Sequence, residues 1–217
     1  MARILITSGP TRQYLDPVRY LTNASSGLMG AALVQAALEL GHQVVVVSGP
    51  VDVTYPSGAQ IVRVVSTEEM LSACSAAFLT CDGLIGAAAP CDYRPQRVAD
   101  QKIAKTGAPL TLELVETPDI VATLGEQKRQ QWLVGFALET EDPRLRALAK
   151  LEKKHCDLMV LNGPQAMHSP LNDVEILDRQ GAVVGAYRGP KAEVARGILG
   201  VIERLLVEPR RHGLGHG

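Results

Sequence analysis

The stretch "SSGLMGAALVQAALELGHQVVVVSGP", residues 25–50, decides the fold class of this chain. Its first half has apolar residues at helical spacing from Leu33 to Leu40, and Gly41 supplies a C-terminal stop before a β-branched apolar run. A similar apolar run, "RILITSG" at 3–9, precedes it. Strand, loop, helix and strand in this order predict a right-handed crossover, which is the opening of a doubly wound α/β sheet.

The rest of the chain continues this alternation of strands and helices. A capping box links Ser66 to Glu69, and Thr117 is expected to cap a later helix, with Pro118 in its first turn. We expect further strands at 60–65, 83–90, 110–116, 132–139 and 157–162, and further helices at 66–80, 117–127, 142–155 and 190–206.

Two short apolar runs near the C-terminus, 174–178 and 182–188, flank the turn Arg179-Gln180-Gly181 and predict a β-hairpin. The sequence shows no internal repeat and no linker. We therefore predict a single α/β domain over residues 1–208, with a Rossmann-like, doubly wound, mostly parallel sheet and a C-terminal β-hairpin. Residues 209–217 lack periodicity and are expected to form a disordered tail.

The composition favours a packed globular protein and excludes several partners. Of 217 residues, 46% are hydrophobic, 21% are charged and 4% are aromatic, and the net charge is -1. A basic or stacking surface for nucleic acid is therefore not expected. Apolar runs are shorter than the ~20 residues that span a bilayer. The four cysteines form no C-x-x-C pair and have no histidine partners at metal-ligand spacing. We expect a cytoplasmic protein that binds no nucleic acid, no membrane and no metal through its own side chains.

Ligands of open parallel sheets bind outside the carboxyl ends of the strands, and polar residues follow several of these ends. Taken singly, each has an ordinary structural interpretation, because loop charges pair with each other and lysines often cover a solvated helix face. Cys91 has no histidine nearby in sequence and is interpreted as a buried thiol. The polar set is cationic and amide-rich and has no nucleophile beside a base: Thr11, Arg12, Asp16, Arg19, Asn23, Asp92, Tyr93, Arg94, Lys102, Lys105, Lys150 and Lys154.

Small polar residues gather where the first helix begins, in "NASSGLMG" at 23–30. Ser25 or Ser26 could cap the helix by accepting a hydrogen bond from a first-turn amide. Alternatively, the free amides and the helix dipole could bind an anion such as a phosphate group. These residues alone leave both interpretations open.

Six motifs, in order and spacing, resemble the phosphopantothenate–cysteine ligases of coenzyme A biosynthesis. They are "TSGPTRQYLDPVRYLTNASSGLMG", "GAAAPCDYRP", "KIAK", "TPDIV", "VGFALET" and "KLEKKHCDLMVLN", and the resemblance covers about residues 3–205. In many bacteria of this family the domain is fused behind a flavin-dependent decarboxylase. The sequence here is similar to the bacterial-type ligase domain alone.

The resemblance implies a two-step ligase reaction. The carboxylate of 4′-phosphopantothenate would first be coupled to a nucleoside triphosphate, CTP rather than ATP, with Mg²⁺, which gives an acyl-nucleotide and pyrophosphate. The amine of L-cysteine would then attack the acyl group. The resemblance also implies a homodimer, in which facing loops complete each acyl site, and the long polar loop at 10–22 is consistent with that expectation.

The resemblance assigns roles residue by residue, and it favours the ligand interpretation of 23–30. The segment 90–107 is expected to be a flap that closes over the nucleotide. Asn23 and Lys102 are the expected catalytic residues, and Arg19, Asn23, Ala88 and Ala89 are the expected substrate-binding residues. The expected nucleotide-binding residues are Gly9, Ser25, Ser26, Gly27, Asp92, Lys102, Pro118, Asp119, Ile120, Val121, Phe136, Lys150 and Lys154.

Some positions depart from the family pattern. The family commonly has lysine where Leu28 and Ala104 stand, and small residues where Pro90 and Cys91 stand. The stretch "GPQAMHSPLND" at 163–173 is also shorter than usual. The site therefore has less positive charge than is typical of the family, which weakens an expectation about nucleotide preference.

Two other functions are alternatives to the ligase. The sequence does not support a nicotinamide-dependent dehydrogenase. The G-x-G-x-x-G motif is missing from the first turn, and the strand at 42–50 has no acidic residue at its C-terminal end. Gly189-Pro190 also breaks the helix that would align Tyr187 with Lys191. A non-catalytic nucleotide-binding module remains open on sequence grounds.

Overall fold

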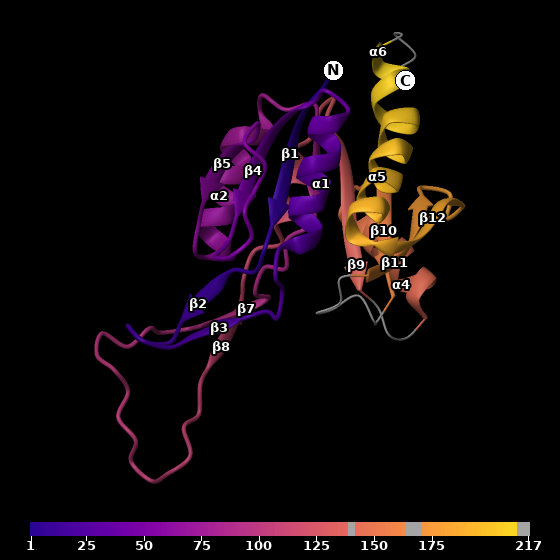
Figure 1. Cartoon of the computed structure of the whole chain (residues 1–217). Coiled ribbons are helices and arrows are strands. Elements are labelled where there is room, and N and C mark those ends of the chain that lie inside the picture. The colour runs from indigo at the N-terminus through magenta and orange to yellow at the C-terminus, as the bar shows by residue number, and fades with distance from the viewer. Residues whose placement is uncertain (139–141, 164–170, 212–217) are drawn as a thin grey trace.

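The central feature of the computed structural model, which describes residues 1–138, 142–163 and 171–211, is one eight-stranded sheet (Figure 1). Its strand order is β12-β11-β10-β9-β6-β1-β4-β5. Six neighbouring strands run parallel: β10, β9, β6, β1, β4 and β5. Strands β11 and β12 add an antiparallel hairpin at the β10 edge. The strands are β1 (Arg3–Ser8), β4 (Gln43–Ser48), β5 (Gln60–Arg63), β6 (Gly83–Gly86), β9 (Trp132–Leu138), β10 (Leu158–Asn162), β11 (Leu171–Asp178) and β12 (Val183–Pro190). The predicted doubly wound α/β fold with a C-terminal hairpin is confirmed.

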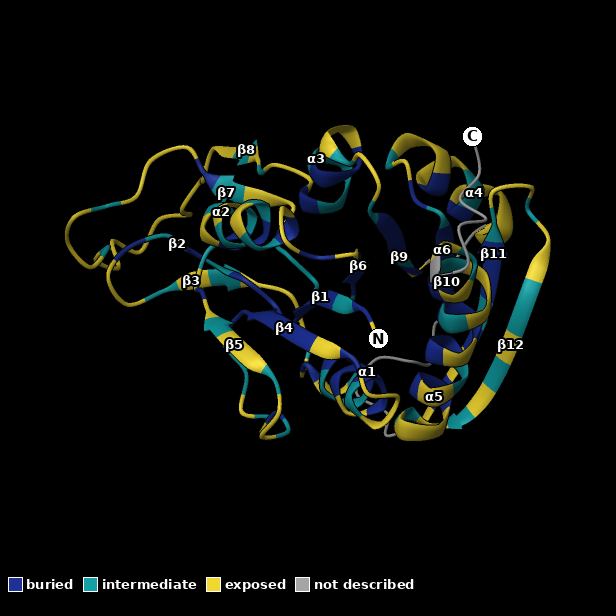
Figure 2. Cartoon of the chain, turned by 90° about the horizontal axis from the view of Figure 1, so that it is seen from above, coloured by how far each residue is buried: buried dark blue, intermediate teal, exposed yellow. Residues whose placement is uncertain are grey.

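Helices cover both faces of the sheet (Figure 2). They are α1 (Leu28–Glu39), α2 (Thr67–Phe78), α3 (Ile120–Gln127), α4 (Pro143–Lys153) and α5 (Lys191–Ile202), followed by a π-helical turn, η2 (Glu203–Val207), and α6 (Glu208–Arg211). Helices α1 and α5 pack on one face, and α2, α3 and α4 pack on the other. Alternation within β1 supplies both layers, since Ile4 and Ile6 join the first core and Leu5 joins the second.

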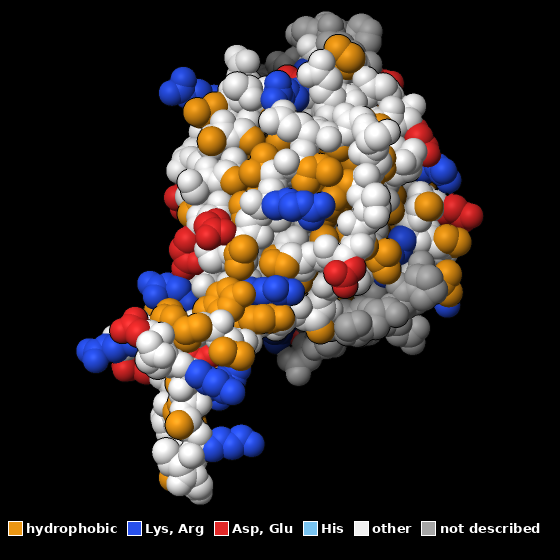
Figure 3. All heavy atoms as spheres, turned by 60° about the vertical axis from the view of Figure 1, so that its left-hand side comes forward, with side chains coloured by type: hydrophobic (Ala, Val, Ile, Leu, Met, Phe, Trp, Pro, Cys, Tyr) orange, Lys and Arg blue, Asp and Glu red, His pale blue; other side chains and the backbone are white. Residues whose placement is uncertain are grey.

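Two small hairpins project from the carboxyl end of the sheet (Figure 1). In one, β2 (Arg12–Tyr14) pairs with β3 (Tyr20–Thr22), and in the other β7 (Tyr93–Pro95) pairs with β8 (Leu114–Glu116). We call residues 96–113, between β7 and β8, the arm loop. Figure 3 shows hydrophobic side chains gathered where these hairpins leave the body of the protein.

The strand expected at 110–116 is the main correction to the sequence-based fold. Only Leu114–Glu116 are a strand, and they pair with β7 outside the central sheet. Residues 110–113 are exposed and contact no strand partner of the sheet. A segment with alternating apolar residues forms a strand only where it meets a sheet edge with which it can pair. Residues 110–113 pair with no strand of the central sheet.

Helix ends also differ from expectation. Helix α1 begins at Leu28, after Gly27 with φ +75°, rather than at Ser25. Helix α3 is capped by Asp119, which accepts from Ala122 N at 3.0 Å, and not by Thr117, whose hydroxyl donates to Cys91 O at 2.6 Å. The C-terminal helix runs on to Arg211, so residues 209–211 of the expected tail are helical, and 212–217 lie outside the described residues. In the described part of the chain, no helix has the length and apolar character needed to cross a membrane.

Candidate active site

A cavity of about 400 Å³ lies at the carboxyl ends of the central strands, beside the N-terminus of α1. Its walls come from residues 23–30, from 87–89 after β6, from 136–138 at the end of β9, and from Asn162, Asn172 and Lys191. The cavity therefore brings together seven residues that the sequence predicts for the site: Asn23, Ser25, Ser26, Gly27, Ala88, Ala89 and Phe136.

The N-terminus of α1 opens into this cavity without a strong cap. Gly27 is the N-cap residue, and the nearest hydroxyl, Ser26 Oγ, accepts from Leu28 N at a long 3.5 Å. The first turn of α1 carries no acidic side chain. Simple capping by Ser25 or Ser26 therefore does not describe this helix mouth, and the positive end of the helix dipole faces the cavity.

Hydrogen bonds fix the loop after β6 against the loop before α1. Asn23 Nδ2 donates to Ala89 O at 3.2 Å and to Pro90 O at 2.8 Å. Ala89 N donates to Gly9 O at 2.9 Å, and Ala88 N donates to Thr7 Oγ1 at 3.2 Å. Asn23, Gly9 and the Ala88-Ala89 pair, which the sequence predicts separately, are thus tied together at the cavity.

A second set of predicted residues gathers around the N-terminus of α3, outside the cavity walls. Lys154 Nζ lies 3.0 Å from Asp119 Oδ2, and Thr117 N donates to Asp92 O at 2.9 Å. Val121 packs on the strand end, because a Cβ built on Gly86 would lie 2.7 Å from Val121 Cγ2. Pro118 and Ile120 belong to the same segment, with Ile120 buried, while Lys150 lies exposed on α4.

Arg19 and Lys102 do not line the cavity. Arg19 lies in the turn between β2 and β3, where its guanidinium Nε donates to Asp16 Oδ2 at 2.9 Å. Lys102 is exposed on the arm loop. The predicted phosphate contact and the predicted flap lysine thus lie together on the projecting hairpins, away from the predicted acyl site.

A family match and two similar proteins relate this chain to known proteins. A family model described as "DNA/pantothenate metabolism flavoprotein C-terminal domain" matches residues 1–206. The chain belongs to this family. The coenzyme A biosynthesis bifunctional protein CoaBC of Bacillus subtilis is 44% identical over 164 residues, which are 75% of this chain and 40% of that protein. CoaBC of Vibrio cholerae is 47% identical over 163 residues, 74% of this chain and 41% of that protein. The chain thus spans less than half the length of these relatives.

A solved crystal structure has the same fold as this chain. The crystal structure of the C-terminal domain of CoaBC matches with a TM-score of 0.81 and 39% identity, over 95% of this chain and 96% of that domain. The family match favours this family over the nicotinamide-dependent dehydrogenase alternative. It also agrees with the doubly wound sheet, whose carboxyl ends hold the cavity.

Cys91 is a buried thiol that holds neighbouring loops together. It is buried, and Cys91 Sγ donates to Thr11 O at 3.4 Å. Cys91 N donates to Thr11 Oγ1 at 2.8 Å, and Cys91 O accepts from Thr67 and Thr117 hydroxyls. Burial raises the pKa of this thiol, so it stays protonated at neutral pH. Cys91 therefore joins three segments as a protonated, buried thiol.

Three polar side chains of the cavity, Asn162, Asn172 and Lys191, are absent from the predicted site. Asn172 is nearly buried, and its Nδ2 donates to Asn162 Oδ1 at 3.3 Å. Lys191 begins α5, and burial lowers its pKa. Asn162 ends a parallel strand, so the rule for carboxyl ends would have found it. Asn172 lies at the start of the antiparallel hairpin and Lys191 at the start of α5, and no local pattern marks either as a cavity residue. Most of the short stretch at 163–173 lies outside the described residues.

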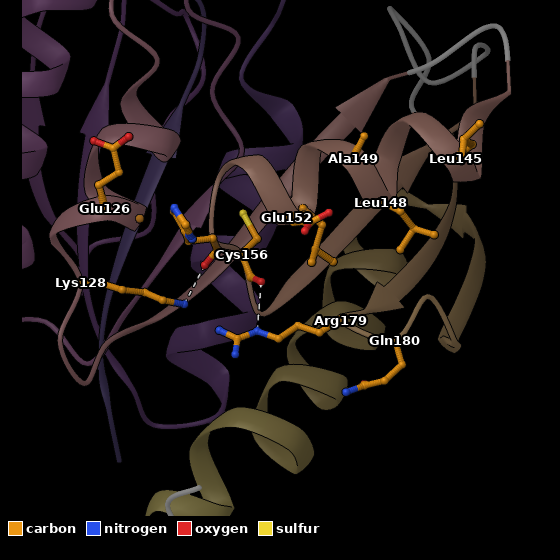
Figure 4. A pocket seen from close by; sticks show the side chains of 12 residues that line it. Glu126, Lys128, Leu145, Leu148, Ala149, Glu152, Cys156, Arg179 and Gln180 are labelled. Atoms are coloured by element: carbon orange, nitrogen blue, oxygen red, sulfur yellow. Dashed lines mark hydrogen bonds between the residues drawn. The ribbon is translucent and has the colours of Figure 1, made fainter. Parts of the chain in front are cut away.

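A larger groove of about 850 Å³ lies at the opposite end of the sheet, beside α4 and the β11–β12 turn (Figure 4). The two positively charged side chains that line it, Lys128 and Arg179, form ion pairs within the fold. Lys128 Nζ lies 2.9 Å from Asp157 Oδ2, and Arg179 Nη2 lies 2.6 Å from Asp157 Oδ1. None of the predicted nucleotide or substrate residues lines this groove. The cavity beside α1 is therefore the candidate active site, although it is the smaller of the two.

Proposed function

We propose that this chain is a ligase that joins 4′-phosphopantothenate to L-cysteine in coenzyme A biosynthesis. The observation that carries the proposal is the cavity beside α1, in which a helix N-terminus, Asn23 and the Ala88-Ala89 backbone converge. The relatives that are named for coenzyme A biosynthesis support it. A helix N-terminus suits a phosphate group, and an amide beside it suits an acyl oxygen.

The chemistry needs an activated acyl group, because a carboxylate is a poor electrophile. The carboxylate oxygen attacks the α-phosphorus of the nucleotide, the bond to the β-phosphate oxygen breaks, and pyrophosphate leaves. The cysteine amine then attacks the acyl carbon, loses a proton, and expels the nucleoside monophosphate. The positive end of α1 stabilises charge on the phosphate, and Asn23 orients the acyl group.

We propose CTP as the nucleotide, on the resemblance to the bacterial ligases alone. Mg²⁺ enters with it as part of the substrate. In the described residues, no group of three or more His, Cys, Asp or Glu side chains could hold a metal ion. A triphosphate carries its own Mg²⁺ through its oxygens, and the metal there stabilises the departing pyrophosphate.

We propose a homodimer in which the hairpins of one protomer face the cavity of the other. Arg19 and Lys102 lie on the projecting hairpins and not at the cavity of their own chain. Exposed apolar side chains accompany them on the same hairpins: Tyr14, Val18, Tyr20, Tyr93, Val98, Leu110, Leu112 and Leu114. Such a patch on a soluble domain marks an interaction surface.

We also propose a cytoplasmic location. All four cysteines, Cys74, Cys81, Cys91 and Cys156, are unpaired, which suits a reducing compartment. The proposed substrates, a nucleotide and a thiol amino acid, are cytoplasmic metabolites.

The activity is tested with Mg²⁺, CTP, 4′-phosphopantothenate and L-cysteine. We expect phosphopantothenoylcysteine, CMP and pyrophosphate, and we expect EDTA to abolish turnover. Without cysteine, mass spectrometry should find an acyl-cytidylate on the protein. An acyl phosphate with CDP would instead indicate activation by phosphoryl transfer. Pyrophosphate that forms no faster with phosphopantothenate than without it would favour the non-catalytic nucleotide-binding module.

A further inference from the structure

The turn between β2 and β3 is built around a buried carboxylate. Asp16 is fully buried, and its Oδ1 accepts hydrogen bonds from Val18 N and Arg19 N, both at 2.8 Å. These two bonds hold the turn in shape. They occupy only one of the two carboxylate oxygens.

The other oxygen reaches the arm loop. Asp16 Oδ2 accepts from Ile103 N at 3.1 Å and from Arg19 Nε at 2.9 Å. The Arg19 guanidinium continues the contact, because its Nη2 donates to Ile103 O at 2.5 Å. One carboxylate and one guanidinium thereby bind both backbone groups of Ile103. We call these contacts the Ile103 clamp.

The clamp is next to the residue that the proposed function needs on the arm loop. Lys102 precedes Ile103 and is exposed, and residues 104–114 that follow are exposed as well. A second hydrogen bond, from Ala99 N to Leu15 O at 2.9 Å, binds the loop three residues before Lys102. The position of Lys102 is therefore set by backbone contacts to the β2–β3 turn rather than by packing of its own side chain.

The electrostatics keep the clamp closed at neutral pH. Burial by itself would raise the pKa of Asp16, but hydrogen bonds from the amides of Val18, Ile103 and Arg19 and from the Arg19 guanidinium outweigh it. The pKa of Asp16 is held well below its usual range. The carboxylate is thus ionised throughout the pH range in which a biosynthetic enzyme works.

We infer that Asp16 is a positioning residue, which sets the place of Lys102 through Ile103. The inference rests on the proposed function for the role of Lys102, and it adds a residue that binds neither nucleotide nor substrate itself. A carboxylate that only stabilised its own turn would have no reason to bind Ile103, which is 87 residues away in sequence. The contact couples the two hairpins.

The first test needs no activity. Asp16→Asn keeps the size of the side chain but removes its charge and one acceptor, so Ile103 N loses its partner. Limited digestion of the free protein with trypsin should then cut after Arg97, Lys102 and Lys105 at least about tenfold faster than in the wild type. Asp100→Asn makes the same change on an exposed position of the arm loop and should cut at the wild-type rate. Wild-type cleavage of Asp16→Asn would overturn the clamp.

The second test asks whether Asp16 acts through Lys102. We expect Asp16→Asn and Lys102→Gln each to lower kcat by at least about tenfold. The double variant should lose no more than the worse single variant, because residues that act as one unit are not additive. Losses that multiply would overturn the positioning role. If the wild type makes no product but the digestion result holds, the proposed function fails and the clamp stands.

A variant that leaves the Asp16–Arg19 ion pair intact guards against misfolding of Asp16→Asn. Ile103→Pro removes the amide that donates to Asp16 and keeps both Asp16 and Arg19, while the ring replaces a half-buried isoleucine side chain. It should reproduce the loss of kcat and the faster cleavage after Arg97 and Lys105. Cleavage after Lys102 is not compared, since trypsin does not cut before proline. Wild-type kcat and cleavage in this variant would also overturn the inference.

Discussion

Asn23 shows how one amide serves the structure and the proposed chemistry together. Its Nδ2 donates to the carbonyl oxygens of Ala89 and Pro90, and this places the β6 loop at the mouth of the cavity. The residue itself is exposed, so its carbonyl oxygen is open to a ligand. An amide can do both, because it has two donors and an acceptor.

Asn23→Asp keeps the shape of the side chain but replaces its amide group with a carboxylate. The carboxylate would face the carbonyl oxygens of Ala89 and Pro90, and it would add negative charge beside a phosphate. We expect kcat/KM for phosphopantothenate to fall by about 30- to 1,000-fold, a loss of about 2 to 4 kcal/mol of transition-state stabilisation. Asn23→Ala, which adds no charge, should lose less. Steady-state kinetics with both variants check this, and wild-type turnover in Asn23→Asp would contradict it.

At the scale of elements, the site depends on how closely α1 approaches β1. Gly30, in the first turn of α1, lies against Ser8 at the end of β1, and a Cβ built on Gly30 would overlap the Ser8 side chain. Ser8 Oγ also donates to Gly27 O at 3.4 Å. A glycine at this point lets the helix N-terminus reach the carboxyl end of the sheet, where the cavity lies.

A matched pair of helical glycines tests this close approach. Gly30→Ala should destabilise the protein by about 1 to 3 kcal/mol, because the added methyl group must displace α1 or Ser8. Gly200→Ala in α5 adds the same group where nothing lies within 4 Å, and it should stabilise the protein by up to about 1 kcal/mol. Urea unfolding measures both changes. Equal effects of the two substitutions would show that crowding at α1 is not the cause.

On the scale of the whole molecule, the apolar side chains of the projecting hairpins predict self-association (Figure 3). Leu114→Glu places a charge on that surface, and we expect sedimentation to shift from dimer toward monomer, with a fall in turnover. Leu79→Glu makes the same change at the end of α2, where the leucine is also exposed, and should leave the dimer intact. A wild-type protein that is monomeric and fully active at micromolar concentration would contradict the dimer.

The sequence by itself determined the architecture of the central sheet and the residues of the helix mouth. Apolar runs of β1, β4, β6, β9 and β10 are continuous because parallel strands are buried on both faces, and this pattern needs no knowledge of neighbours. Local rules also sufficed for the capping box of Ser66 and Glu69 and for the C-terminal hairpin. The residues near Asn23 followed from the rule for strand carboxyl ends and from the family resemblance.

Only the tertiary structure decided what depends on partners far apart in the chain. The segment 110–116 alternates like a strand, but its pairing with β7 outside the sheet depends on where that edge lies. From the sequence alone Asp16 is a loop charge, and only the fold brings Ile103 within hydrogen-bond distance of it. Asn172 reaches the cavity because the start of β11 pairs antiparallel beside the end of β10. Periodicity and capping report on neighbours within a few residues, so contacts across long loops are invisible to them.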